Sequence, residues 1–250
     1  MKLMTLHYVR SESAVKSAVR DLVRAHGIPT TPEAADDLAA RLWPILSDQR
    51  ATLAARELEL IKAEFPEFLA AVRRFYPVTA TSRATRNAAG LNPLAPGVAV
   101  EHLDPVSQKQ ARQIVRAWQH PDDPAVVARF IEELAASSSR HVKSASRDLV
   151  TDTARLNRAG WARQLSGAES CAFCAMLVSR GAVYSRESVD FRTHNHCDCT
   201  ATLVRNAGDD YPGKEQARVL AGLYRAAGGD LTTMGKLIQE EVGDYATLAA

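Results

Sequence analysis

The four cysteines of this chain lie in one short segment and have the spacing of a metal site. Cys171 and Cys174 form a C-x2-C pair, and Cys197 and Cys199 form a C-x-C pair after 22 intervening residues. The 250 residues contain no other cysteine. Zinc prefers thiolate ligands, and a structural zinc site uses four protein ligands in a tetrahedral shell. The sequence therefore predicts one structural zinc ion held by these four side chains.

Two histidines directly before the second pair are alternative ligands. If this stretch forms a strand, Cys197 and Cys199 share one face and His194 and His196 share the other, because side chains alternate along a strand. That parity favours an all-cysteine site. A turn at Asn195 would instead let one histidine replace a cysteine.

Three other interpretations of the cysteines remain open. They are two disulfides formed in an oxidising medium, packed thiols without a ligand, and a catalytic or redox-active thiol. The redox interpretation is weak, because such a C-x-x-C pair opens a helix after a strand in a βαβ unit, whereas helical sequence precedes this one. A catalytic zinc needs a nearby acid or base. Glu169, Glu187 and Asp198 are near in sequence but fall in no recognised metalloenzyme pattern.

The composition is that of an ordinary globular protein, with 46% hydrophobic and 24% charged residues. A formal net charge of +2 is too small to indicate nucleic-acid binding by itself. The first ten residues lack the apolar run of a secretory signal, and no apolar run reaches the about 18 residues of a membrane span. We therefore expect folding in a reducing cytoplasm, where paired cysteines more often bind metal than form disulfides.

Outside the cysteine segment, apolar spacing predicts long amphipathic helices. One is expected at 13–26. Thr31 followed by Pro32 is a typical helix start and opens the next helix, with a kink or break expected at Pro44. The polar run 137–139 is expected to interrupt a later helix. Short apolar pieces after residue 160 indicate strands, so the cysteines lie in a small unit of mixed α and β structure.

The predicted fold class is mostly α, with long amphipathic helices and a small α+β Cys/His-rich unit near residues 160–205. Strands are expected at 161–165, 181–184 and 200–204. Helices are expected at 214–226 and 231–241. We divide the chain into an N-terminal helical region, a Pro- and Gly-rich loop or linker, a second helical region, the Cys/His unit and C-terminal helices. Their ranges are, in order, 1–76, 77–103, 104–158, 159–205 and 206–250.

Basic side chains before the cysteines are candidates for contact with an acidic partner or with DNA phosphates. Arg140, Lys143 and Arg147 are spaced to share one helix face, and Arg155 and Arg158 extend the basic character toward the cysteines. A solvated helix face with no partner is the alternative interpretation.

Four motifs follow one another in a distinctive order. They are a helix leading into a Trp, C-x-F-C, R-G-x-x-Y and H-x-H-C-x-C, at 154–163, 170–177, 180–184 and 194–199. Together they resemble the MuF-like minor capsid proteins of tailed phages, in particular the actinobacteriophage branch. The resemblance covers about residues 140–205, and the remainder agrees only in its helical style.

The resemblance implies a minor capsid, or minor head, protein that associates with the portal inside the capsid, at one vertex of the virion. It implies roles in head assembly, DNA packaging and DNA ejection. The implied partners are the portal protein, capsid or scaffold components and packaged DNA. The protein would be in the host cytoplasm during assembly. By similarity, the four cysteines, with His194 or His196, occupy the family's characteristic positions.

Two other function classes remain as alternatives. One is an enzyme, either a capsid maturation protease or a nuclease-like activity centred on His194, His196 and Asp198. The other is a zinc-stapled DNA-binding module that uses the basic side chains. No G-x-S-x-G or comparable nucleophile motif occurs in the sequence, so we expect no enzymatic activity.

Overall fold

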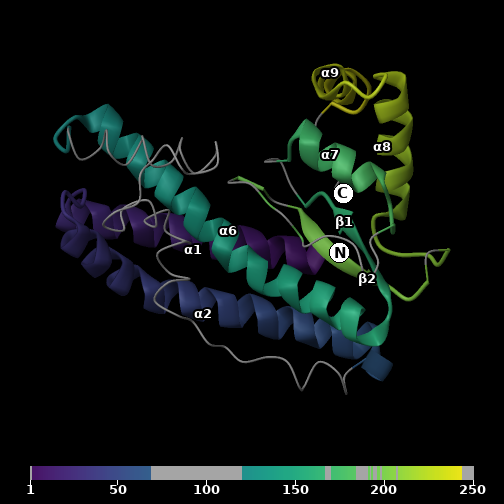
Figure 1. The fold of residues 1–250 in the computed structure, drawn as a ribbon, viewed down its shortest axis with the longest axis horizontal. Coiled ribbons are helices and arrows are strands. Elements are labelled where there is room, and N and C mark those ends of the chain that lie inside the picture. The colour runs from purple at the N-terminus through teal and green to yellow at the C-terminus, as the bar shows by residue number, and fades with distance from the viewer. Residues whose placement is uncertain are drawn as a thin grey trace. The chain divides into compact units, whose positions relative to one another are not determined.

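The structure is a computed structural model that describes residues 2–68, 120–166, 170–183 and most of 191–243. Within the last range, Arg192, His194, Asn195, Asp198 and Ala207 lie outside the description. The described residues are mostly helical and include one two-stranded sheet, which confirms the predicted fold class (Figure 1). The elements are α1 (Lys2–His26), α2 (Pro32–Glu64), η1 (Pro66–Phe68), α6 (Pro124–Asn157), β1 (Gly160–Gln164), α7 (Ala172–Ser179), β2 (Thr200–Val204), α8 (Lys214–Ala226) and α9 (Leu231–Glu241).

Helix α2 begins as its sequence predicts but does not break where expected. The Thr31 hydroxyl accepts a hydrogen bond from the backbone N–H of Ala34 at 3.2 Å, which caps the first turn. The helix then continues through Pro44 to Glu64. Leu42 and Leu46, on either side of this proline, are fully buried, and Pro44 itself is exposed. Core packing of its neighbours therefore outweighs the hydrogen bond that proline cannot make.

Helix α6 also runs without the predicted interruption. The run 137–139 lies inside it, and all three serines are buried. Leu134 and Val142 on either side are buried as well. Small serine side chains let other elements approach a helix closely, so the polar run is part of a packed helix rather than a loop. The prediction of a break was wrong because tertiary packing decided this segment.

By its internal contacts the chain divides into two compact units. Unit 1 comprises Met1–Tyr8, Leu53–Pro77 and Ser144–Ala250, and unit 2 comprises Val9–Thr52 and Val78–Lys143. Helices α1, α2 and α6 each contribute a segment to both units. The five-part division drawn from the sequence stays a prediction.

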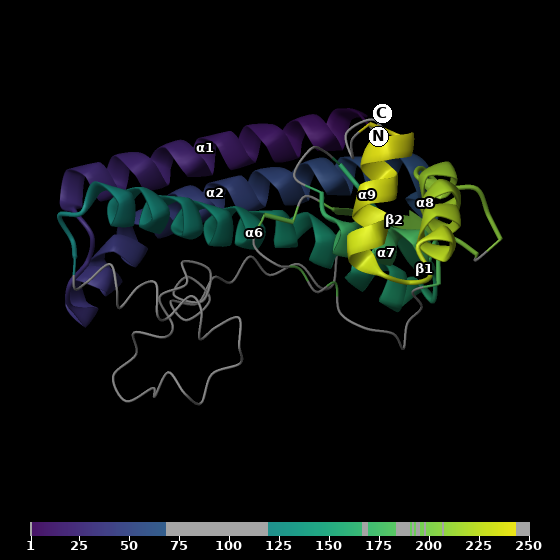
Figure 2. The ribbon, with the colours of Figure 1, turned by 90° about the horizontal axis from the view of Figure 1, so that it is seen from above.

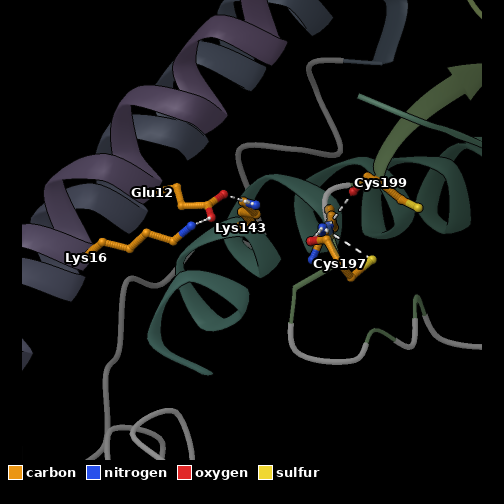
Figure 3. A network of polar contacts seen from close by, with 6 residues as sticks. Glu12, Lys16, Lys143, Cys197 and Cys199 are labelled. Carbon is orange, nitrogen blue, oxygen red and sulfur yellow. Dashed lines mark hydrogen bonds and ion pairs between the residues drawn. The ribbon is translucent and has the colours of Figure 1, made fainter. Parts of the chain in front are cut away.

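In unit 2, segments of α1, α2 and α6 lie side by side around an aliphatic core (Figure 1). An ion pair joins two of them. The carboxylate of Glu12 on α1 pairs with the ammonium group of Lys143 on α6 at 2.6 Å and with that of Lys16 on its own helix at 2.5 Å (Figure 3). The aromatic ring of Trp43 on α2 lies 6.0 Å from that of His141 on α6.

In unit 1, β1 and β2 pair antiparallel, with Trp161 opposite Leu203. These two side chains pack with residues of α2 and α6, including Ile61 and Val150. The opposite face of the sheet contributes Ala162 and Val204 to a cluster with Tyr211. Both faces of the small sheet are therefore buried. The described residues 181–183 form no strand, which corrects the strand predicted at 181–184 as far as Val183.

Helices α7, α8 and α9 pack against one another in unit 1, and Figure 2 shows α9 beside α8. Their shared core includes Val178 of α7, Leu220 of α8 and Met234 and Ile238 of α9, all fully buried. Both C-terminal helices have the bounds that the sequence predicts. The same core contains three of the four cysteines, so this helical layer positions the candidate site.

Candidate metal centre

The first cysteine pair is positioned by the start of α7. Cys171 is the N-cap residue of this helix, and its Sγ accepts a hydrogen bond from the backbone N–H of Cys174 at 3.5 Å. Cys174 lies in the first turn and is 1% exposed. Cysteine can cap a helix because its sulfur accepts the N–H that the first turn leaves free. The C-x2-C spacing thus turns both sulfurs toward the start of one helix.

The second pair lies in the segment that leads into β2. Cys197 is 2% exposed and Cys199 is fully buried. Strand β2 begins only at Thr200, so Cys197 and Cys199 do not lie in a strand, and the condition on which the parity argument rested is not met. His196 has a φ of 63°, a left-handed conformation that turns the chain just before Cys197. The turn, rather than strand parity, brings this pair to the site.

Three buried cysteines lie close enough together to bind one metal ion. The Sγ atoms of Cys174, Cys197 and Cys199 are all within 4.8 Å of one another. The Sγ atoms of Cys174 and Cys197 are 3.7 Å apart. Two sulfurs bound to one tetrahedral zinc ion at 2.3 Å would be separated by about 3.8 Å. The separation of this pair therefore suits a shared zinc ion.

No disulfide joins the four cysteines in the structure. Cys171 is the outer member of the set, because it is partly exposed and is absent from the group of three close sulfurs. It remains in contact with the cluster, because its sulfur accepts the hydrogen bond from the backbone N–H of Cys174 at 3.5 Å. Cys171 is therefore the described residue best placed to supply a fourth ligand.

Of the two candidate histidines, the structure describes His196, and it does not join the cluster. His196 is exposed and does not belong to the group of three close sulfurs. His194, Asn195 and Asp198 lie outside the described residues, as do Glu169 and Glu187. The predicted alternative of a histidine ligand is therefore not supported for His196, and the structure does not describe His194.

Contacts among the sulfurs shift the pKa values of the Cys174 and Cys197 thiols in opposite directions. Hydrogen bonds to Cys171, Cys197 and Cys199 raise the pKa of the Cys174 thiol, and burial raises it further. Hydrogen bonds from Cys174 and Cys199 lower the pKa of the Cys197 thiol. Burial opposes this effect, and the charge of Arg147 adds to it. Of these two thiols, Cys197 therefore ionises more readily, and a thiolate is the form that binds a metal.

Arg147 of α6 contacts the second pair directly, which the sequence did not predict. Its Nε donates a hydrogen bond to the carbonyl oxygen of Cys199 at 2.8 Å, and its Nη2 donates to that of Cys197 at 2.9 Å. These bonds are drawn as dashed lines at Cys197 and Cys199 in Figure 3. The helical spacing of Arg147 placed it on a basic face but could not show that this face is turned inward.

The five basic residues singled out in the sequence have different environments. Lys143 and Arg147 are 3% and 1% exposed, so the prediction of a surface contact is wrong for these two. Tertiary partners explain their burial, an ion pair with a carboxylate for Lys143 and two carbonyl oxygens for Arg147. Arg140 is partly exposed, and Arg155 and Arg158 are exposed. For these three, contact with a partner or DNA stays a prediction.

Comparison with known families decides what kind of protein carries this site. The VG15 protein family matches residues 31–227, a range that includes all of α2, all of α6 and all four cysteines. The chain belongs to the VG15 family. VG15 is a family of phage proteins and indicates an association with the virion. No curated protein and no solved structure matches the chain.

The VG15 match extends beyond the cysteine segment on both sides. It begins at the cap of α2 and ends just after α8. The match therefore includes α6, α7 and α8 as well as the cluster itself, whereas α9 lies beyond it. Within the described part of this VG15 protein, no helix combines the length and the apolar character that crossing a bilayer requires.

Proposed function

We propose that this VG15 protein is a minor capsid protein of a tailed phage that associates with the portal inside the capsid. In that position it assists head assembly and the packaging and ejection of DNA. The observation that carries the proposal is the VG15 match over residues 31–227. The order of the C-x-F-C, R-G-x-x-Y and H-x-H-C-x-C motifs supports it, because that order resembles the MuF-like minor capsid proteins.

The long helices α1, α2 and α6 are the proposed docking elements. Val9 on α1 and Leu156 on α6 are large apolar side chains that are 58% and 37% exposed. Exposed apolar side chains on such helices are groups that a larger assembly can cover. Phe173 on the short helix α7 is 44% exposed and serves as a matched control.

The test is co-expression of the full chain with the portal protein of the same phage, followed by size-exclusion chromatography. We expect the wild-type chain to elute with the portal ring, and the Val9→Asp and Leu156→Asp variants to co-elute with it in smaller amounts. We expect Phe173→Asp to co-elute with the portal ring in the same amount as the wild type. Failure of the wild type to elute with the portal would overturn the proposed association. Co-elution of all variants with the portal ring in equal amounts would overturn docking through the long helices.

Mass spectrometry of purified heads gives an independent check. A minor capsid protein should be present at low copy number in procapsids and in DNA-filled heads. Absence from both would contradict the proposal. Divalent-dependent cleavage of scaffold protein or of DNA by the purified chain would favour one of the enzyme alternatives instead. Salt-dependent retention on DNA without any binding to the portal would favour the DNA-binding alternative.

We also propose that the cysteine cluster holds one structural zinc ion. Cys174, Cys197 and Cys199 would supply three thiolates, and Cys171 would supply the fourth. The donor set fits the ion, because soft thiolates suit zinc and a closed four-ligand site stabilises a fold. The ion would join the start of α7 to the segment before β2. A two-stranded sheet, as the described residues form it, is marginally stable by itself, so a metal cross-link next to β2 would add stability there.

A further inference from the structure

Arg147 contributes a buried positive charge next to the cysteine cluster. The residue is 1% exposed, and its guanidinium donates to the carbonyl oxygens of Cys199 and Cys197 at 2.8 and 2.9 Å. Its Nη2 also lies 3.9 Å from the Sγ of Cys197. One side chain of α6 therefore touches both the backbone and a sulfur of the second cysteine pair.

No carboxylate balances this charge among the residues that the structure describes. The other neighbours of the guanidinium are aromatic rings, with its Cζ 5.2 Å from the ring centre of Phe191 and 6.0 Å from that of Tyr8. Its Nη1 is buried and has no hydrogen-bond partner among the described residues. A buried charge without a counter-charge is strongly unfavourable. The adjacent group able to carry negative charge is the cysteine cluster.

A metal–thiolate site has the complementary charge. A zinc dication bound by three thiolates carries one net negative charge, and one bound by four carries two. Such a site is costly to bury unless a positive group lies close by. The outer contacts of a metal site also fix the orientation of its ligands. Arg147 is placed for both tasks, because it holds the backbone at both ligands and brings its charge to one sulfur.

We propose that Arg147 is the positioning residue and counter-charge of the cysteine cluster. It fixes the Cys197–Cys199 segment to α6 and offsets the negative charge of the metal-bound thiolates. This inference rests on the proposed zinc site. It predicts that zinc binding also reduces local opening of α6 around residue 147, because this guanidinium joins the ligands to the helix.

The test measures the zinc affinity of the full chain, stripped of metal under reducing conditions, by competition with a chromogenic zinc chelator. Arg147→Gln removes the charge and the two-carbonyl contact, and Arg147→Lys keeps only the charge. We expect Arg147→Gln to weaken zinc binding by about 10- to 100-fold and Arg147→Lys to fall between it and the wild type. Arg155→Gln, an exposed arginine of the same helix, should bind zinc as the wild type does.

A second control separates this role from general destabilisation. Gln216 accepts a buried hydrogen bond from the N–H of Leu165 at 2.9 Å, so Gln216→Ala should weaken unit 1 without a change of charge at the cluster. If Gln216→Ala loses as much zinc affinity as Arg147→Gln, the specific role of Arg147 is refuted. Hydrogen exchange of α6 amides near residue 147 should slow on zinc addition in the wild type and less in Arg147→Gln.

The outcomes distinguish this inference from the zinc proposal. A wild type that binds no zinc overturns the zinc site and this role of Arg147 with it. A wild type that binds zinc while Arg147→Gln binds equally well overturns only the role of Arg147. Far-UV circular dichroism of the metal-free variants shows whether they fold. If Arg147→Gln does not fold, Arg147→Lys decides, and zinc affinity equal to that of the wild type would refute the positioning contact.

Discussion

The Sγ atoms of Cys174 and Cys197 lie 3.7 Å apart, although 23 positions separate the residues in sequence. Different parts of unit 1 hold the two sulfurs. Cys174 is fixed by α7, which packs against α8 and α9. Cys197 is fixed by the hydrogen bond from Arg147 of α6 to its carbonyl oxygen. The cluster is thus a cross-link between the helical layer after the sheet and the long helix before it.

Loss of a sulfur should weaken unit 1 and leave the long helices folded. We expect Cys171→Ser and Cys174→Ser to lower the thermal stability of the zinc-loaded protein, with an effect on the order of 2 kcal/mol or more for the buried Cys174. Far-UV circular dichroism should change little, because α1, α2 and α6 contain most of the described helix. Excess chelator should remove most of the difference from the wild type. Equal melting of wild type and both variants, with zinc present, would speak against a structural role for the cluster.

Glu57 should make the protein less stable as pH rises. Burial raises the pKa of its carboxyl to about 7, and the hydrogen bond from Ser146 opposes the rise. Below about pH 4.5, the ordinary pKa of Glu, the carboxyl is protonated in both the folded and the unfolded chain, so ionisation costs nothing. Between about 4.5 and 7 the unfolded chain releases the proton first, and stability falls.

The matching variant is Glu57→Gln, which cannot ionise and can still accept the Ser146 hydrogen bond of 2.6 Å. It should unfold at higher denaturant than the wild type at pH 8, by up to roughly 3 kcal/mol, and match it near pH 4.5. Glu59→Gln, an exposed position on the same helix, is the matched control and should change the stability little. Parallel pH profiles for the wild type and Glu57→Gln would refute this prediction.

Glu12 should have the opposite pH dependence. Burial alone would raise the pKa of its carboxyl, but the charge and hydrogen bond of Lys143, together with Lys16, lower it to about 2. Its contribution to stability is therefore complete above about pH 4.5 and is lost as the pH falls toward 2. Because Glu12→Gln leaves Lys143 buried without its partner, we expect a loss of about 3 kcal/mol at pH 7.

Denaturant unfolding at pH 7 and pH 3 checks this ion pair. The difference between wild type and Glu12→Gln should shrink at pH 3, because the unfolded chain, with a Glu pKa near 4.5, binds a proton there while the folded chain, with a pKa of about 2, mostly does not. Asp37→Asn removes the carboxylate of an exposed pair with Arg41 and should barely change stability at either pH. A difference between Glu12→Gln and wild type that stays constant with pH would contradict the assignment.

Two glycines at and within α8 should respond to alanine in opposite directions. Gly213 has a φ of +93°, and an added Cβ would lie 2.7 Å from Cγ of Gln164. Gly213→Ala should therefore destabilise the protein by about 1 to 3 kcal/mol. Gly222, within the same helix, has nothing within 4 Å of an added Cβ. Gly222→Ala should stabilise by about 0.5 to 1 kcal/mol. Chemical denaturation of the two variants would refute the argument if both moved the same way.

Local patterns in the sequence were sufficient for several elements. The bounds of β2, α8 and α9 follow from short apolar runs and their Gly and Asp boundaries, and the structure has the predicted bounds. Thr31 caps α2 as expected. The cysteine spacing also predicted convergence, because close pairs need only local turns to bring sulfurs together.

The remaining features depend on contacts between distant residues. Periodicity placed Lys143 and Arg147 on one helix face. It could not show that this face is buried, with Glu12 as the partner of Lys143 and the Cys197 carbonyl oxygen as a partner of Arg147. The breaks expected at Pro44 and at 137–139 do not occur, because packing overrides the local preference of proline and serine. The left-handed turn at His196 could not be predicted, because the residue in this conformation is not a glycine.

Metal content is the most direct test of the cysteine cluster as a metal site. The full chain would be purified under reducing conditions and analysed by elemental mass spectrometry, with thiols counted before and after chelation. We predict one zinc per chain and thiols that react only after the metal is removed. A metal-free protein whose four thiols react at once, in a folded state, would contradict the zinc site and leave the VG15 match as the support for the proposed function.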